Sequence, residues 1–298
     1  MFDIRTDLAL EMGEMYREQN PGLTEIDGVK TQILKEELYT VTKVFILNSN
    51  GEKALSKKTG SYFTIESDLL LTGDTSAISS VSDCLCRELS GMLGKFSYKT
   101  VLVAGLGNRE ITPDSIGPET VSKLLVTRHI FGEMPTLSDV LAPVCAIAPG
   151  VLGITGIETL EILKGVTERV APDIVIVIDA LAARKPERIA TTIQICDTGI
   201  TPGSGVLNSR KEISRETLGI PVIVIGVPMV VDAASIVRDA VENIPEKDLQ
   251  KVLKTSSLIV TPKDVDSLAK RMSHILANGI NLALQPKLSP EDIATLTS

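Results

Sequence analysis

The stretch that decides the fold is Ile174-Val175-Ile176-Val177-Ile178-Asp179 (IVIVID, 174–179). Its run of β-branched apolar residues shows no polar alternation, which predicts a strand covered on both faces, as in a parallel sheet. The run Val222–Val227 has the same character, and Thr100–Ala104 and Leu258–Val260 are shorter strand-like runs. Helix-like segments separate these runs, at 119–131, 156–169, 233–243 and 265–277. The alternation predicts an α/β fold, a three-layer sandwich with a mostly parallel central sheet.

The first part of the chain predicts an addition to this sheet. Thr40–Leu47 and Tyr62–Ile65 are strand-like, and Asn50-Gly51 is a turn signal between them. We therefore expect a β-hairpin addition over residues 40–66 with a long, Lys-rich tip. A further strand, Thr191–Cys196, is expected to be antiparallel and leads into a Gly/Pro loop. No linker or repeat interrupts the chain, so residues 1–298 are predicted to form a single domain.

Composition excludes several function classes. The 298 residues carry 30 Lys plus Arg and 38 Asp plus Glu, a net charge of −8, which argues against direct nucleic-acid binding. No apolar window is long enough to span a membrane. The cysteines are too scattered for a disulfide framework and fit free thiols in a reducing cytoplasm; they are Cys84, Cys86, Cys145 and Cys196. His129 and His274 are the only histidines, which weighs against zinc hydrolysis and His-dependent triads.

Ligands of such sheets bind beyond the carboxyl ends of the strands, so the residues after each apolar run matter most. After the first run, Gly105-Leu106-Gly107 resembles the start of a dinucleotide-binding turn. The third glycine is replaced by Glu110, whose charge would oppose a pyrophosphate, and Pro113 interrupts the following helix start. The sequence therefore argues against a nicotinamide cofactor.

Two carboxylates are expected at this same edge of the sheet. Asp179 directly ends the IVIVI run, and Asp114 lies in the loop after the first strand. Neighbouring strands are about 4.8 Å apart, so these loops can bring the two side chains together. Desolvation and a like-charged neighbour both raise a carboxyl pKa, which would leave one acid protonated and one ionised. The alternative is that both are turn formers or helix caps. Arg184 is either a surface ion pair or a site residue.

Six blocks carry a resemblance to a known family. They are IRTDLALE (4–11), GLGNREITPDSIGP (105–118), CAIAPGVLGITGIET (145–159), VIVIDALAAR (175–184), DTGITPGSGVLNSRKEIS (197–214) and GIPVIVIGVPMVVDAAS (219–235). Together they cover much of the chain and resemble the germination proteases of spore-forming bacteria. Those enzymes degrade small acid-soluble spore proteins during germination. Their core fold is similar to that of the hydrogenase maturation endopeptidases.

The resemblance implies roles for particular residues. The family's proposed catalytic aspartates fall on Asp114 and Asp179, which implies an atypical aspartic endopeptidase in which a carboxylate pair activates water. Expected substrate-binding or orienting residues are Gly105, Gly107, Asn108, Thr112 and Arg184. No cofactor and no catalytic metal are expected, since neither histidine follows a strand end.

The resemblance also implies a zymogen with a short propeptide, a homotetramer and a location in the forespore and spore core. Only Met1-Phe2-Asp3 precede Ile4, so residues 1–3 are expected to be a vestigial propeptide. Two alternatives remain open from the sequence: a metal-assisted peptidase on the same fold, and a non-catalytic α/β protein that binds a small ligand.

Overall fold

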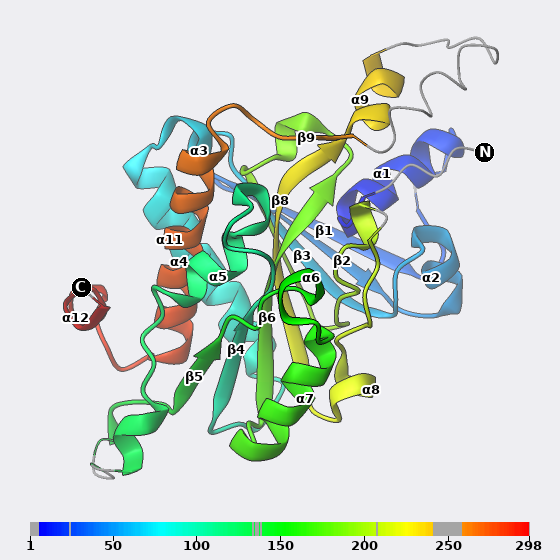
Figure 1. Cartoon of the computed structure of the whole chain (residues 1–298). Helices are drawn as coiled ribbons and strands as arrows, with labels where there is room; N and C mark the ends of the chain where they lie inside the picture. Colours follow the sequence, from blue (N-terminus) through cyan, green and yellow to red (C-terminus); the bar gives the residue numbers. More distant parts are fainter. Residues whose placement is uncertain are drawn as a thin grey trace.

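The structure is a computed structural model that describes residues 6–297 except 24, 133, 135, 136, 138, 207 and 241–257. The expected propeptide residues 1–3, and residues 241–243 of the expected helix 233–243, lie outside the described residues. One mixed sheet runs through the molecule in the order β1-β2-β3-β7-β8-β6-β4-β5, with β9 paired to β8 (Figure 1).

The parallel part of the sheet contains β5 (Val144–Ile147), β4 (Val101–Gly105), β6 (Ile174–Ala183) and β8 (Val222–Asp232). Three of these strands are the apolar runs expected from the sequence. The prediction that Leu258–Val260 forms a fourth strand of the parallel sheet was wrong. This run forms β9 (Ile259–Val260), a short exposed strand that is antiparallel to the end of β8. β5 takes the fourth parallel place, and its Cys-Ala centre gives little β-propensity to detect.

The antiparallel part continues the same sheet through β7 (Thr192–Cys196) to β3 (Gly60–Glu66), β2 (Thr40–Ile46) and β1 (Val29–Lys35). The expected hairpin is present as β2 and β3, and β7 is antiparallel as expected. The prediction of a turn at Asn50-Gly51 was wrong, because both residues lie in a helix. Asn48 accepts hydrogen bonds from both backbone amides and so caps a short helix, α2 (Ser49–Leu55).

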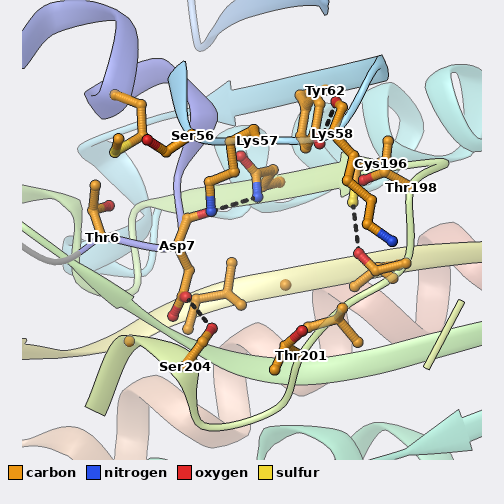
Figure 2. Close-up of a pocket in the computed structure, with 18 of the residues that line it drawn as sticks. Thr6, Asp7, Ser56, Lys57, Lys58, Tyr62, Cys196, Thr198, Thr201 and Ser204 are labelled. Atoms are coloured by element: carbon orange, nitrogen blue, oxygen red, sulfur yellow. Dashed lines mark hydrogen bonds between the residues drawn. The ribbon is translucent and has the colours of Figure 1, made fainter. Parts of the chain in front are cut away.

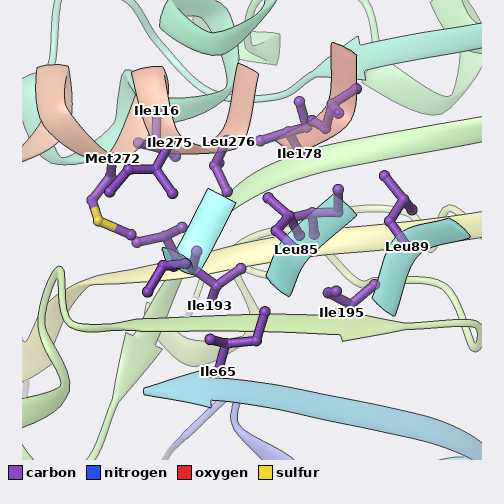
Figure 3. Packing of buried hydrophobic residues seen from close by; sticks show 14 of the residues in the cluster. Ile65, Leu85, Leu89, Ile116, Ile178, Ile193, Ile195, Met272, Ile275 and Leu276 are labelled. Atoms are coloured by element: carbon purple, nitrogen blue, oxygen red, sulfur yellow. The ribbon is translucent and has the colours of Figure 1, made fainter. Parts of the chain in front are cut away.

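Helices cover both faces of the sheet and make the predicted α/β sandwich (Figure 1). One core packs α4 (Thr75–Leu93), α5 (Ile116–Val121) and α11 (Val265–Leu284) onto sheet residues such as Ile178 and Ile193 (Figure 3). The other core packs α1 (Ala9–Gln19), α2 and α7 (Thr159–Val170) onto the opposite face. The remaining α-helices among the described residues are α3 (Leu69–Thr72), α6 (Leu152–Thr155), α8 (Arg215–Leu218), α9 (Ala233–Ala240) and α12 (Pro290–Thr297).

The expected helix 119–131 is shorter than its pattern suggested. α5 ends at Val121, and a separate 3₁₀ turn covers Arg128–Gly132. Within the described residues, no helix has both the length and the apolar character needed to cross a bilayer.

Candidate active site

Asp179 lies in the middle of β6, which is buried at nearly every position; the strand was expected to end at Ile178, and that end was wrong because β6 continues to Ala183. Asp179 is only 5% exposed and lies opposite Gly226 of β8. Burial is the main cause that raises its pKa well above the ordinary range, and the charges of Asp114 and Asp7 add to the effect. The apolar run that forms the strand therefore also desolvates the carboxyl group at its end.

Asp114 is positioned by the loop that follows β4. This loop closes as a 3₁₀ turn over Thr112–Asp114, and the backbone N–H of Asn108 donates to the Asp114 carboxylate at 2.8 Å. Gly107 has a φ of +108°, and a Cβ there would lie 2.0 Å from the backbone oxygen of Asp114. Only glycine fits where the loop folds back so closely on Asp114. Burial raises the pKa of Asp114, and the Asn108 N–H opposes that rise.

The two acids lie within electrostatic reach of each other. The Asp114 charge raises the pKa of Asp179, and Leu106, which leads into the Asp114 loop, donates its N–H to the carbonyl of Ile178 at 2.8 Å. Two neighbouring carboxyl groups repel each other when both are ionised, so they tend to keep one proton between them. Their apparent pKa values then describe the pair and not either residue alone. Such a pair contains a general base and a general acid at the same pH.

The other predicted site residues lie in different surroundings. Asn108 contacts Asp114 through its backbone, while its side-chain oxygen accepts from the N–H of Glu110 at 3.0 Å. Thr112 donates its hydroxyl to Asp266 on α11 at 2.7 Å. Gly105 packs against the backbone of Gly117 in α5, where a Cβ would lie 2.2 Å from a carbonyl oxygen. The structure thus brings Asn108 and Gly107 to Asp114, whereas the contacts of Thr112 and Gly105 are with helices.

Arg184 belongs to a buried ion-pair network around helix α1. Its guanidinium pairs with Asp239 at 3.0 Å and Glu18 at 2.7 Å. The centre of the network is Glu11, fully buried, which accepts from the backbone N–H of Arg184 and from the guanidinium of Arg188 at 3.0 Å. The network fastens α1 to the loop that follows β6.

Sequence reasoning missed a third carboxylate at the site. Asp7 makes two hydrogen bonds with the backbone of Ala182. The Asp7 N–H donates to the Ala182 carbonyl, and the Asp7 carboxylate accepts from the Ala182 N–H at 2.8 Å. Ser204 donates to the other carboxylate oxygen at 3.0 Å. Asp7 and Ala182 are 175 positions apart in the chain, so no local pattern could have revealed the contact.

A pocket of about 430 Å³ opens beside this segment (Figure 2). It is lined by the N-terminal segment, by the connection from α2 to β3 and by the loop that follows β7. Its lining residues include Leu181, two residues after Asp179 on β6, and Gly226, which lies opposite Asp179 on β8. The pocket therefore lies on the same side of the molecule as the Asp7 segment and reaches the strand that carries Asp179.

Comparison with known proteins identifies the family. The family model described as germination protease matches residues 9–256. The chain belongs to the germination protease family. Among its relatives, the germination protease of Clostridium perfringens (strain 13 / Type A) is 45% identical, over 98% of each chain. That of Bacillus cytotoxicus is 38% identical, over 99% of this chain and 97% of the relative.

A search of solved structures found the [NiFe] hydrogenase maturation protease HycI from Thermococcus kodakarensis KOD1. It is 17% identical with a TM-score of 0.33, and the match covers 64% of this chain and 97% of that chain.

The thiols of this germination protease family member are poorly suited to act as nucleophiles. Burial raises the pKa of Cys84 to about 11 and also raises the pKa values of Cys86, Cys145 and Cys196. Thiols with raised pKa values hold little thiolate at neutral pH. Among the described residues, no three His, Cys, Asp or Glu side chains are grouped closely enough to hold a metal ion.

The raised pKa of Asp179 predicts a pH-dependent cost in stability. The folded pKa lies above the ordinary 3.8, so the cost is absent below that pH and grows as the pH rises towards the folded pKa. Asp179→Asn removes this cost. We expect it to raise the melting temperature at pH 7, by on the order of 5 °C, with a gain that shrinks towards pH 4. Thermal unfolding of both proteins across that range measures it; an equal difference at both pH values contradicts the assignment.

Proposed function

We propose that this protein is an endopeptidase that degrades small acid-soluble spore proteins during germination, with Asp114 and Asp179 activating the attacking water. Membership of the germination protease family supports a peptidase. The observation that carries the aspartate mechanism is the pair itself: two carboxyl groups from neighbouring strands, both with raised pKa values, coupled to each other.

The pair can perform hydrolysis with one shared proton. The ionised carboxylate takes a proton from water, and the water oxygen bonds to the carbonyl carbon of the peptide. The protonated carboxyl then gives its proton to the leaving nitrogen as the C–N bond breaks. The pair ends with one proton, as it began. Because Asp179 is the more deeply buried acid, we assign the proton to it in the resting state, with Asp114 as the base.

The N-terminal segment supports regulation as a zymogen. Asp7 pairs with the backbone of Ala182, lines the pocket and places its charge near Asp179. A substrate chain that binds along the end of β6 needs the same hydrogen-bonding groups. We therefore propose that the protein is made as a zymogen, with this segment lying over the end of β6 and the residues before Ile4 removed by self-processing.

Several further expectations accompany this function. We propose that the protein works in the forespore and spore core as a homotetramer. Its substrates are small spore proteins freed from DNA, and no cofactor takes part. The net charge of −8 fits the absence of direct DNA contact.

Digestion with and without a chelator tests the proposal. The full-length protein is incubated until its intact mass no longer changes, then mixed with a purified, DNA-free small acid-soluble spore protein. We expect discrete fragments, with rates within about twofold in the presence and absence of EDTA, because the carboxylate pair supplies both proton transfers. Mass spectrometry of the fragments measures the outcome.

Each other result rejects a specific part of the proposal. Loss of cleavage in EDTA, restored by a divalent metal, replaces the aspartate mechanism with a metal-assisted one. Absence of cleavage by the processed protein rejects the assigned substrate and favours a binding protein.

A further inference from the structure

The carboxylate of Asp7 is held on several sides near the end of β6 (Figure 2). One of its oxygens accepts from the backbone N–H of Ala182 at 2.8 Å, and the other accepts from the hydroxyl of Ser204 at 3.0 Å. Gly205 packs on the same carboxylate, because a Cβ there would lie 2.3 Å from Oδ2 of Asp7. The next residue of the segment, Leu8, is fully buried. None of these contacts uses residues 1–3, so we expect Asp7 to keep its place after self-processing.

Asp7 contacts β6 where the pairing of that strand is irregular. The register between β6 and β8 shifts between Leu181 and Ala182. Irregularities of this kind re-aim nearby side chains and are common beside active sites. Asp7 binds both backbone groups of Ala182, since its own N–H also donates to the Ala182 carbonyl at 2.9 Å. Asp179 lies three residues earlier on the same strand, which places the Asp7 carboxylate on the order of 10 Å from it.

The charges that act on Asp179 are both negative. They belong to Asp114, from the loop after β4, and to Asp7, from the N-terminal segment, and each acts with burial to raise the pKa of Asp179. The residue opposite on β8, Gly226, carries no charge. Among the residues that the structure describes, no Lys or Arg lies within ion-pair distance of Asp179 or Asp7. Two acids therefore oppose the ionisation of Asp179, and no ion pair offsets them.

The cations near the site have other partners. Lys57 donates to the backbone carbonyl of Asp7 at 3.0 Å and not to its carboxylate. Lys58, in the same pocket, is paired with Glu212. On the loop after β4, the Arg109 guanidinium donates to a backbone carbonyl of α5 at 3.0 Å. The Asp7 charge is therefore not cancelled locally, and inside a protein such a charge acts over several ångströms.

We propose that Asp7 is a positioning residue that keeps one proton on the Asp114–Asp179 pair at neutral pH. This inference rests on the proposed peptidase function and adds a third acid that exchanges no proton itself. The negative charge of Asp7 opposes the loss of the last proton from the pair, so the pair enters each cycle as one acid and one base. Its hydrogen bonds to Ala182 hold the strand that carries the acid.

The pH dependence of kcat in Asp7→Asn tests the proposal, with the DNA-free small acid-soluble spore protein as substrate. Asparagine keeps an acceptor for Ala182 but loses the charge. Removal of a negative charge lowers the pKa of the pair, so the basic limb of the profile should move to lower pH by about one pH unit. On that limb kcat should fall about tenfold, whereas near pH 6 it should stay within about threefold of the wild type.

Asp232→Asn is the matched control for the loss of one negative charge. Asp232 ends the neighbouring strand β8, six residues beyond Gly226, and caps α9. We expect its basic limb to coincide with that of the wild type. An equal movement of the limb in Asp7→Asn and Asp232→Asn would show a general effect of net charge and overturns the inference.

A second measurement needs no turnover. The gain in melting temperature from Asp179→Asn grows with pH and levels off once the pH passes the folded pKa of that acid. In an Asp7→Asn background the gain should level off at a pH lower by the same amount. If the limb or the levelling point moves by less than about 0.3 pH units, the inference is wrong and the peptidase function stands. Failure of the processed wild type to cleave rejects the function, and the inference with it.

Discussion

Replacement of Asp179 by Asn is expected to reduce kcat on a small acid-soluble spore protein by about 10³–10⁴-fold, and Asp114→Asn by a similar factor. Asparagine keeps the size of the side chain and cannot exchange a proton, so each variant removes one of the two proton transfers. Because the residues act as a pair, the double variant should be no slower than about the slower single variant. Initial rates of fragment formation at pH 7 measure the effect.

Asp232→Asn is the matched control for this prediction. Asp232 is another aspartate at the end of a strand, and its carboxylate accepts from the backbone N–H groups of Ala234 and Ser235 at the start of α9. Asparagine caps helices as well as aspartate does, so we expect full activity. If Asp114→Asn and Asp179→Asn retain activity within about twofold of Asp232→Asn, both acids are structural and the assigned site is wrong.

Removal of the Arg188 guanidinium is expected to produce the largest loss of stability. Arg188 pairs with Glu11, Glu14 and Glu66 at 2.6–3.0 Å, and the Glu11 side chain is fully buried. Arg188→Met leaves the Glu11 charge without its main counter-ion, which typically costs about 3–5 kcal/mol. For a chain of this size that corresponds to a fall in melting temperature on the order of 10 °C, measured by calorimetry at pH 7.

Arg184→Met is the comparison variant. Its partner Glu18 has a side chain that is 52% exposed, so water replaces much of the lost contact. We expect a clearly smaller loss than for Arg188→Met. Pairing Arg188→Met with Glu11→Gln should recover part of the stability, because the orphaned charge is then removed. Equal losses in the two arginine variants, with no recovery in the double variant, contradict the view that Glu11 is the centre of the network.

Local patterns predicted the central strands well because strand formation there depends on continuous apolar character. β6 and β8 are buried on both faces, and each begins with an unbroken run of β-branched residues, IVIVI in β6 and VIVI in β8. β5 and β9 show the limit of this reasoning. Val144–Ile147 becomes the parallel strand at the edge of the sheet because it pairs along β4, whereas the more apolar Leu258–Val260 pairs only with the end of β8.

The sequence by itself determined the α/β class and indicated that Asp114 and Asp179 lie near each other, because each acid follows an apolar run that must become a buried strand. The structure extends the second strand beyond Asp179 to Ala183. Only the tertiary structure decided what surrounds them. Asp7, Lys57 and Gln194 meet at one peptide unit, although Asp7 and Gln194 are 187 positions apart in the chain. Their contacts are single hydrogen bonds between distant segments, and such bonds leave no periodicity in the sequence. They exist because the sheet continues from β6 through β8 to β7 and carries Gln194 to the same face as Asp179.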